Sequence, residues 1–89
     1  MSHVLRFKFK KGVPKKLIES QIAIAIVTAE ATFGNAKVRI HAGYIVSKDK
    51  AVIDVSSDVG EHIAQVFTGL MTRQVGENKF SVDRVNAKD

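Results

Sequence analysis

The stretch Leu5–Pro14, LRFKFKKGVP, alternates strictly between apolar and basic residues and then breaks at a glycine and a proline. An alternation of period two places Phe7 and Phe9 on one face of a β-strand and the cations on the other face. Pro14 suits the first turn of a helix, because its missing N–H has no intrahelical partner there. This stretch therefore predicts a half-buried strand over residues 3–10 that leads directly into a helix.

The segment after the break predicts a long helix, Pro14–Thr32. Its apolar residues recur at helical spacing, and Gly34 is placed as a C-terminal cap. The string IAIAIV at residues 22–27 alone would suit a strand, but the apolar content persists too long for one. Ile24 and Val27 widen the apolar arc, so they either rim the core or contact another molecule.

Three further segments complete the pattern. AKVRIHAGYIVS, Ala36–Ser47, and AVIDVS, Ala51–Ser56, alternate around a polar turn and predict a β-hairpin. SSDVGEHIAQVFTGLMTRQVG, Ser56–Gly76, has an amphipathic stripe and a terminal glycine, which predict a second helix. KFSVDRV, Lys79–Val85, predicts a fourth strand, and residues 86–89 are interpreted as a frayed tail.

The order strand–helix–strand–strand–helix–strand leaves few topologies when connections are short and right-handed. The dominant one is an α+β, ferredoxin-like βαββαβ sandwich, in which two helices cover one face of a four-stranded antiparallel sheet. Its fourth and first strands lie together, followed by the third and the second. We expect a single domain, residues 1–89. The side chains expected in its core from the strands are those of Leu5, Phe7, Phe9, Val38, Ile40, Ile53, Val55, Phe80 and Val82.

The other face of this sheet is predicted to be open and basic. Its candidate anion- or partner-binding residues are Arg6, Lys8, Lys10, Lys37, Arg39 and His41. The formal net charge of +5 suits an acidic protein, a small anion or nucleic acid. Three interpretations stay open: a solvated face with cross-strand ion pairs, a surface for a nucleic-acid backbone, and a surface for a subunit or anionic ligand. No aromatic residue is expected to point outward, so base stacking is not predicted.

The sequence does not favour catalysis, and no metal or cofactor is expected. It contains no cysteine, and its three histidines lack metal-ligand spacing. It has neither a phosphate-binding glycine loop nor a nucleophile elbow. The lack of cysteine fits a reducing cytoplasm. The longest apolar run, Ile22–Val27, is too short to cross a membrane, so no membrane partner is expected.

Two families share this order of elements and this length. KGVPKKLIES, Lys11–Ser20, resembles the turn into the first helix of ACT-type regulatory domains. KKGVP and SSDVGEHIAQVF, Ser56–Phe67, are similar, less closely, to segments of bacterial microcompartment shell domains. The resemblance implies a ferredoxin-like fold and a small regulatory or assembly module, and it transfers no binding residue to this chain.

We therefore expect a cytoplasmic, non-enzymatic module for binding, assembly or regulation that acts as a homo-oligomer and through its basic face. Ile24, Val27 and Gly69 are the candidate interface residues. A mid-helix glycine costs about 1 kcal/mol relative to alanine, and Gly69 would allow a second helix to approach closely. The alternative is a protein that binds the backbone of RNA or DNA without sequence preference.

Overall fold

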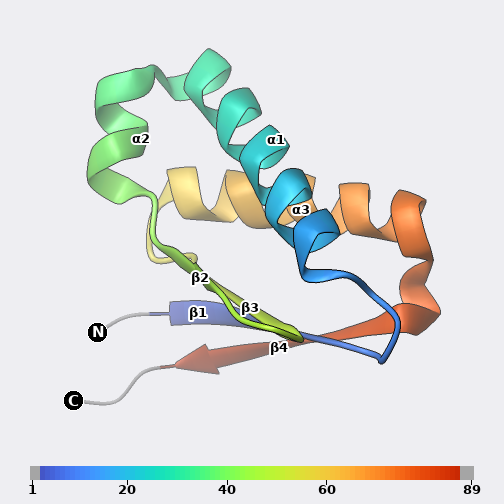
Figure 1. Ribbon diagram of the computed structural model, residues 1–89. Helices are drawn as coiled ribbons and strands as arrows, with labels where there is room; N and C mark the ends of the chain where they lie inside the picture. Colours follow the sequence, from blue (N-terminus) through green and yellow to red (C-terminus); the bar gives the residue numbers. More distant parts are fainter. Residues whose placement is uncertain (1–2, 87–89) are drawn as a thin grey trace.

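The computed structural model describes residues 3–86, which form one four-stranded antiparallel sheet and three α-helices (Figure 1). The sheet order is β2-β3-β1-β4, so each strand has the neighbours expected from the sequence. All three helices lie on one side of the sheet, and the other side is open (Figure 1). In chain order the elements are β1 (His3–Phe9), α1 (Lys15–Phe33), α2 (Asn35–His41), β2 (Tyr44–Val46), β3 (Lys50–Asp54), α3 (Asp58–Val75), the 3-10 turn η1 (Glu77–Lys79) and β4 (Phe80–Asn86).

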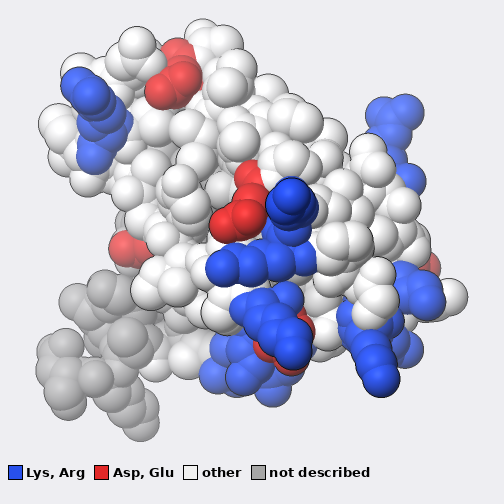
Figure 2. Space-filling view, viewed as in Figure 1, with Lys and Arg blue, Asp and Glu red and all other residues white. Residues whose placement is uncertain are grey.

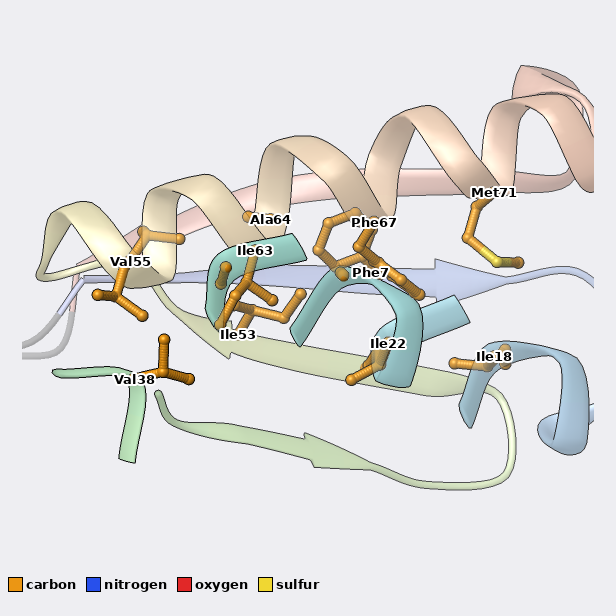
Figure 3. Close-up of a cluster of buried hydrophobic side chains, with 14 of the residues drawn as sticks. Phe7, Ile18, Ile22, Val38, Ile53, Val55, Ile63, Ala64, Phe67 and Met71 are labelled. Carbon is orange, nitrogen blue, oxygen red and sulfur yellow. The ribbon is translucent and has the colours of Figure 1, made fainter. Parts of the chain in front are cut away.

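A single hydrophobic core fills the space between the sheet and the helices (Figure 3). Phe7 of β1 and Phe67 of α3 are fully buried, and their rings meet edge to face with centroids 5.0 Å apart. Ile53 of β3 and Ile22 of α1 complete the centre of this cluster. The alternation in β1 and β3 is therefore confirmed, because Phe7 and Phe9 of β1 and Ala51 and Ile53 of β3 are buried against the helices.

The two long helices begin and end where the sequence predicts. α1 follows Pro14 and ends at Gly34, whose φ is 90°, a value that glycine adopts without a steric penalty. α3 is capped by Ser57, whose hydroxyl accepts a hydrogen bond from the Gly60 N–H at 3.1 Å. It ends at Gly76 with a φ of 88°.

The strand predicted over Ala36–Ser47 is wrong for most of its length, because Asn35–His41 forms α2. β3 ends at Asp54, whose N–H donates to the Gly43 carbonyl, so residues before Gly43 would have no partner in β3. A helix supplies its own backbone hydrogen bonds instead.

α2 also changes which of its side chains reach the core. Val38 is buried, as expected, but it comes from a helix rather than from a strand. Ile40, also predicted in the core, is 74% exposed, and that prediction is wrong. Val82 of β4 faces the helices but stays 39% exposed.

The C-terminal strand extends one residue beyond its prediction. Asn86, assigned from the sequence to the tail, is the last residue of β4 and pairs with His3. The rest of the predicted tail, residues 87–89, lies outside the described residues. None of the helices within residues 3–86 has the length and apolar character needed to cross a bilayer.

Candidate interaction surfaces

The structure does not bring the six predicted face residues together. Lys37, Arg39 and His41 lie on α2 and not on the sheet, which corrects their predicted position. The Lys37 ammonium lies 3.0 Å from the Asp58 carboxylate and 4.9 Å from the centroid of the Phe33 ring. The hydrogen bond from Lys37 holds the pKa of Asp58 below its ordinary value. Lys37 therefore ties α2 to the start of α3.

The open face of the sheet is mixed in character rather than basic along its whole length. Arg6 of β1 is paired across the sheet with Asp83 of β4 and Val52 of β3. Lys8 is paired with Ser81 and Lys50, so two like charges stand opposite each other. The register places four apolar side chains on the same face, and these belong to Val4, Ile45, Val52 and Val85.

Lysines gather instead at one end of the sheet, which we call the lysine end. Its members lie in four chain segments: the end of β1 with the β1–α1 loop, the start of α1, the β2–β3 turn, and η1. Figure 2 shows Lys and Arg concentrated from the lower centre to the right of the view, where Figure 1 places these segments. The lysine end comprises Lys8, Lys10, Lys11, Lys15, Lys48 and Lys79.

Backbone hydrogen bonds fix these segments against one another. The Phe9 N–H donates to the Asp49 carbonyl at 2.8 Å, which holds the β2–β3 turn against the end of β1. The Lys10 N–H donates to the Lys79 carbonyl at 2.8 Å, which holds η1 on the other side. A hollow of about 560 Å³ lies between the β1–α1 loop and the β2–β3 turn. Backbone hydrogen bonds therefore hold the segments of the lysine end together, and the surface is concave at its centre.

The six lysines of the lysine end outnumber the acids of the same segments, which are Asp49 in the β2–β3 turn and Glu77 in η1. Within residues 3–86 the ion pairs are Lys37–Asp58 and Arg84–Glu61, so neither involves this surface. Asp49 is the acidic residue that lines the hollow. The first turn of α1 contains no acidic residue, and its lysines meet the positive end of the helix dipole. This end of the molecule therefore carries an excess of positive charge.

A second surface is the groove between α1 and the edge strand β2. The groove has a volume of about 390 Å³ and is lined by Glu19, Ile22, Ala23, Ile26, Tyr44 and Val46. The Gly43 carbonyl accepts from the Asp54 N–H, and the Ser47 N–H donates to the Lys50 carbonyl. Alternate residues of an antiparallel pair direct their backbone groups to opposite sides, so those of Tyr44 and Val46 point away from β3.

The predicted interface residues occupy different parts of the helical layer. Val27, 61% exposed, follows Ala23, which lines the groove, by one helical turn. Ile24, 45% exposed, lies further round α1, on the side away from Ile26 and the groove. Gly69 is exposed on α3, and a Cβ added there would meet nothing within 4 Å.

His62 and Asp54, outside these surfaces, make local contacts. His62 meets the Phe33 ring edge to face, with centroids 5.5 Å apart. The Ser56 N–H donates to the Asp54 carboxylate at 2.9 Å, and hydrogen bonds from the Ser56 hydroxyl and N–H lower the pKa of Asp54. Within residues 3–86 no group of three or more His, Asp or Glu side chains lies close enough together to hold a metal ion.

The alternation of the first strand marks two members of the lysine end, Lys8 and Lys10, as surface residues, but it does not indicate the surface that they form with the other lysines. The other members lie in turns and at helix ends, where no periodicity marks a face. The signal available was that each predicted turn on this side of the sandwich contains lysine.

No protein-family model, curated protein or solved structure matches this chain.

Proposed function

We propose that this chain is a non-enzymatic assembly module with a ferredoxin-like fold that forms a homodimer through α1 and the free edge of β2. The order of its strands and the helices on one face support that fold, with α2 as an insertion before the second strand. The observation that carries the dimer is the groove between α1 and β2, where apolar side chains flank unpaired backbone groups.

The edge of β2 is suited to pairing with a second copy of itself. Tyr44 and Val46 direct their N–H and carbonyl groups away from β3, and β2 ends the sheet. A two-fold axis beside β2 pairs the two edges antiparallel and joins the two sheets into one. Both surfaces are then identical, which is the requirement for a closed dimer.

Three residues of β2 give too few hydrogen bonds to hold a dimer alone, so α1 must contribute. Ala23 lines the groove, exposed Val27 lies one helical turn after it on α1, and the Tyr44 side chain, 46% exposed, lies on the helix side of β2. Joined sheets place the two α1 helices next to each other across the axis. Burial of these apolar side chains supplies the favourable free energy of association.

The test compares two single substitutions on the same helix. Val27→Glu places a charge in the proposed interface, and Ile24→Glu places the same charge outside the groove. Sedimentation velocity at low and high salt is expected to show a dimer for the unmodified chain and for Ile24→Glu, and a monomer for Val27→Glu. A dimer that only Ile24→Glu disrupts would locate the interface on the outer helical surface and overturn the proposal.

A second pair of variants tests the strand edge. Tyr44→Pro removes the N–H that points away from β3, while the hydrogen bonds of Gly43 and Ser47 to β3 are retained. Tyr44→Ala removes the same side chain and keeps the N–H. We expect Tyr44→Pro to weaken the dimer more than Tyr44→Ala does. Equal effects would show that β2 does not pair across the axis.

A further inference from the structure

We infer that the lysine end binds the phosphate backbone of a nucleic-acid duplex, independently of base sequence. This surface lies outside the α1–β2 groove, so the inference does not rest on the proposed dimer. It also differs from the face expected from the sequence, because Lys37, Arg39 and His41 belong to α2.

The concentration of lysines without ion pairs favours the binding of an anionic partner. Lys8 faces Lys50 across the β1–β3 pair, and like charges in that position are unfavourable. Neither ion pair within residues 3–86 involves the lysine end, and the start of α1 adds dipole charge of the same sign. A bound polyanion would relieve these repulsions and release its condensed counterions.

The dimensions of the surface suit a duplex. Lys48 lies in the β2–β3 turn and Lys79 just before β4, with β3 and β1 between them. With about 4.8 Å between neighbouring strands, the lysines extend over about 10–14 Å. This distance is comparable to the width of the major groove of B-DNA, about 12 Å. Lysines at the two sides can therefore reach phosphates of both strands.

Within residues 3–86, the lysine end has no exposed aromatic ring, which favours a duplex over a single strand. Phe9 is 6% exposed and Phe80 is half-buried, and their rings lie 5.7 Å apart, on the helix side of the sheet. Proteins that bind single strands without sequence preference combine basic grooves with bases stacked on aromatic side chains. The lysine end has the charge alone, which is sufficient for backbone contacts to a duplex.

An anionic membrane is a poorer match for the same charge. The large apolar side chains that are exposed within residues 3–86 are those of Ile24, Val27, Ile40, Tyr44, Ile45 and Val82. None of them belongs to the loop, turn or helix start that forms the lysine end. Peripheral membrane binding relies on an inserted apolar face or a lipid anchor in addition to charge.

The test uses the full chain and a fluorescein-labelled, mixed-sequence duplex of 20 base pairs, with anisotropy measured between 50 and 200 mM KCl. Neutralisation of four to six phosphates gives a slope of log K against log salt of about −3.6 to −5.4. Affinity should then fall by about two to three orders of magnitude over this range.

Two double variants with the same change in net charge separate a local site from general attraction. Lys10→Glu with Lys48→Glu alters the lysine end, and Lys37→Glu with Arg39→Glu alters α2. We expect the first pair to lower the affinity at 50 mM by about tenfold or more, and the second pair by less than about threefold. Circular dichroism confirms that both variants are folded before the comparison is made.

Several results would overturn the inference. These are an absence of binding to the duplex at 50 mM KCl, an equal loss of affinity in the two double variants, and a salt slope near zero. Tighter binding to a single strand of the same length, or to vesicles containing phosphatidylserine, would assign the surface to that partner instead. A monomeric chain that still binds the duplex would leave the inference intact and contradict only the proposed dimer.

Discussion

At Gly60 the first turn of α3 passes directly against the backbone of β3. A Cβ at this position would overlap the carbonyl oxygen of Asp54, and a backbone atom cannot rotate away as a side chain can. Alanine is the better helix former, so propensity alone predicts a gain in stability. Because of this close approach, we expect Gly60→Ala to lower the stability instead of raising it. Gly60 therefore allows α3 to lie against the sheet.

We predict that Gly60→Ala lowers the free energy of unfolding by about 3 kcal/mol, as overpacking of a close contact does. Urea denaturation followed by circular dichroism measures this change. A loss smaller than about 0.5 kcal/mol would show that α3 can shift away from β3 without cost.

Asp54 links stability to pH through Ser56. Hydrogen bonds from the Ser56 hydroxyl and N–H lower the pKa of Asp54 below 3.8, and Ser56 in turn accepts from the His3 N–H at 3.0 Å. Because the pKa is lower in the folded state, the ionised group stabilises the fold above its unfolded pKa. That contribution disappears as the pH falls through the folded pKa.

We therefore predict that Asp54→Asn is less stable than the unmodified chain at pH 7 and that the difference shrinks below pH 3.8. Urea denaturation at a series of pH values tests this. Ser56→Ala is the control, since Asp54→Asn should have a smaller pH-dependent effect in that background. A difference that does not vary with pH would contradict the assigned cause.

At the scale of elements, replacing each of the two glycines of α3 by alanine is expected to change the free energy of unfolding in opposite directions. Gly69 is exposed and has open space where a Cβ would be, so Gly69→Ala should raise the free energy of unfolding by about 1 kcal/mol. It lies outside the groove between α1 and β2, so sedimentation should show the same oligomer as before. Loss of the oligomer in Gly69→Ala would instead place Gly69 in the oligomer interface, as expected from the sequence.

The helices and strands were predictable to the extent that a single local signal defined each of them. Pro14 and Gly34 bound α1, and the alternation of Phe7 and Phe9 defines β1. The segment Ala36–Ser47 has the same alternation, yet most of it lies outside β2, because β3 is too short to pair with it. Period two indicates that a strand is possible, but a strand also needs a partner of matching length.

At the scale of the whole molecule, the two proposed surfaces are expected to respond differently to salt. The α1–β2 groove is apolar and uses backbone groups, so association there should persist at high salt. The lysine end acts through charge, and its binding should weaken steeply as salt rises. One titration of oligomeric state and duplex binding against KCl therefore distinguishes the two functions in the same sample.

The sequence by itself determined the order of the strands and long helices, the side of β1 that is buried, and the positions where α1 and α3 end. These features follow from periodicity and from the backbone preferences of proline and glycine, which act locally. Only the tertiary structure decided that residues 35–41 form a helix and that lysines from four segments meet at one end. The pairing of strands and the clustering of surface charges depend on contacts between segments that are distant in the chain, and a local sequence pattern does not contain this information.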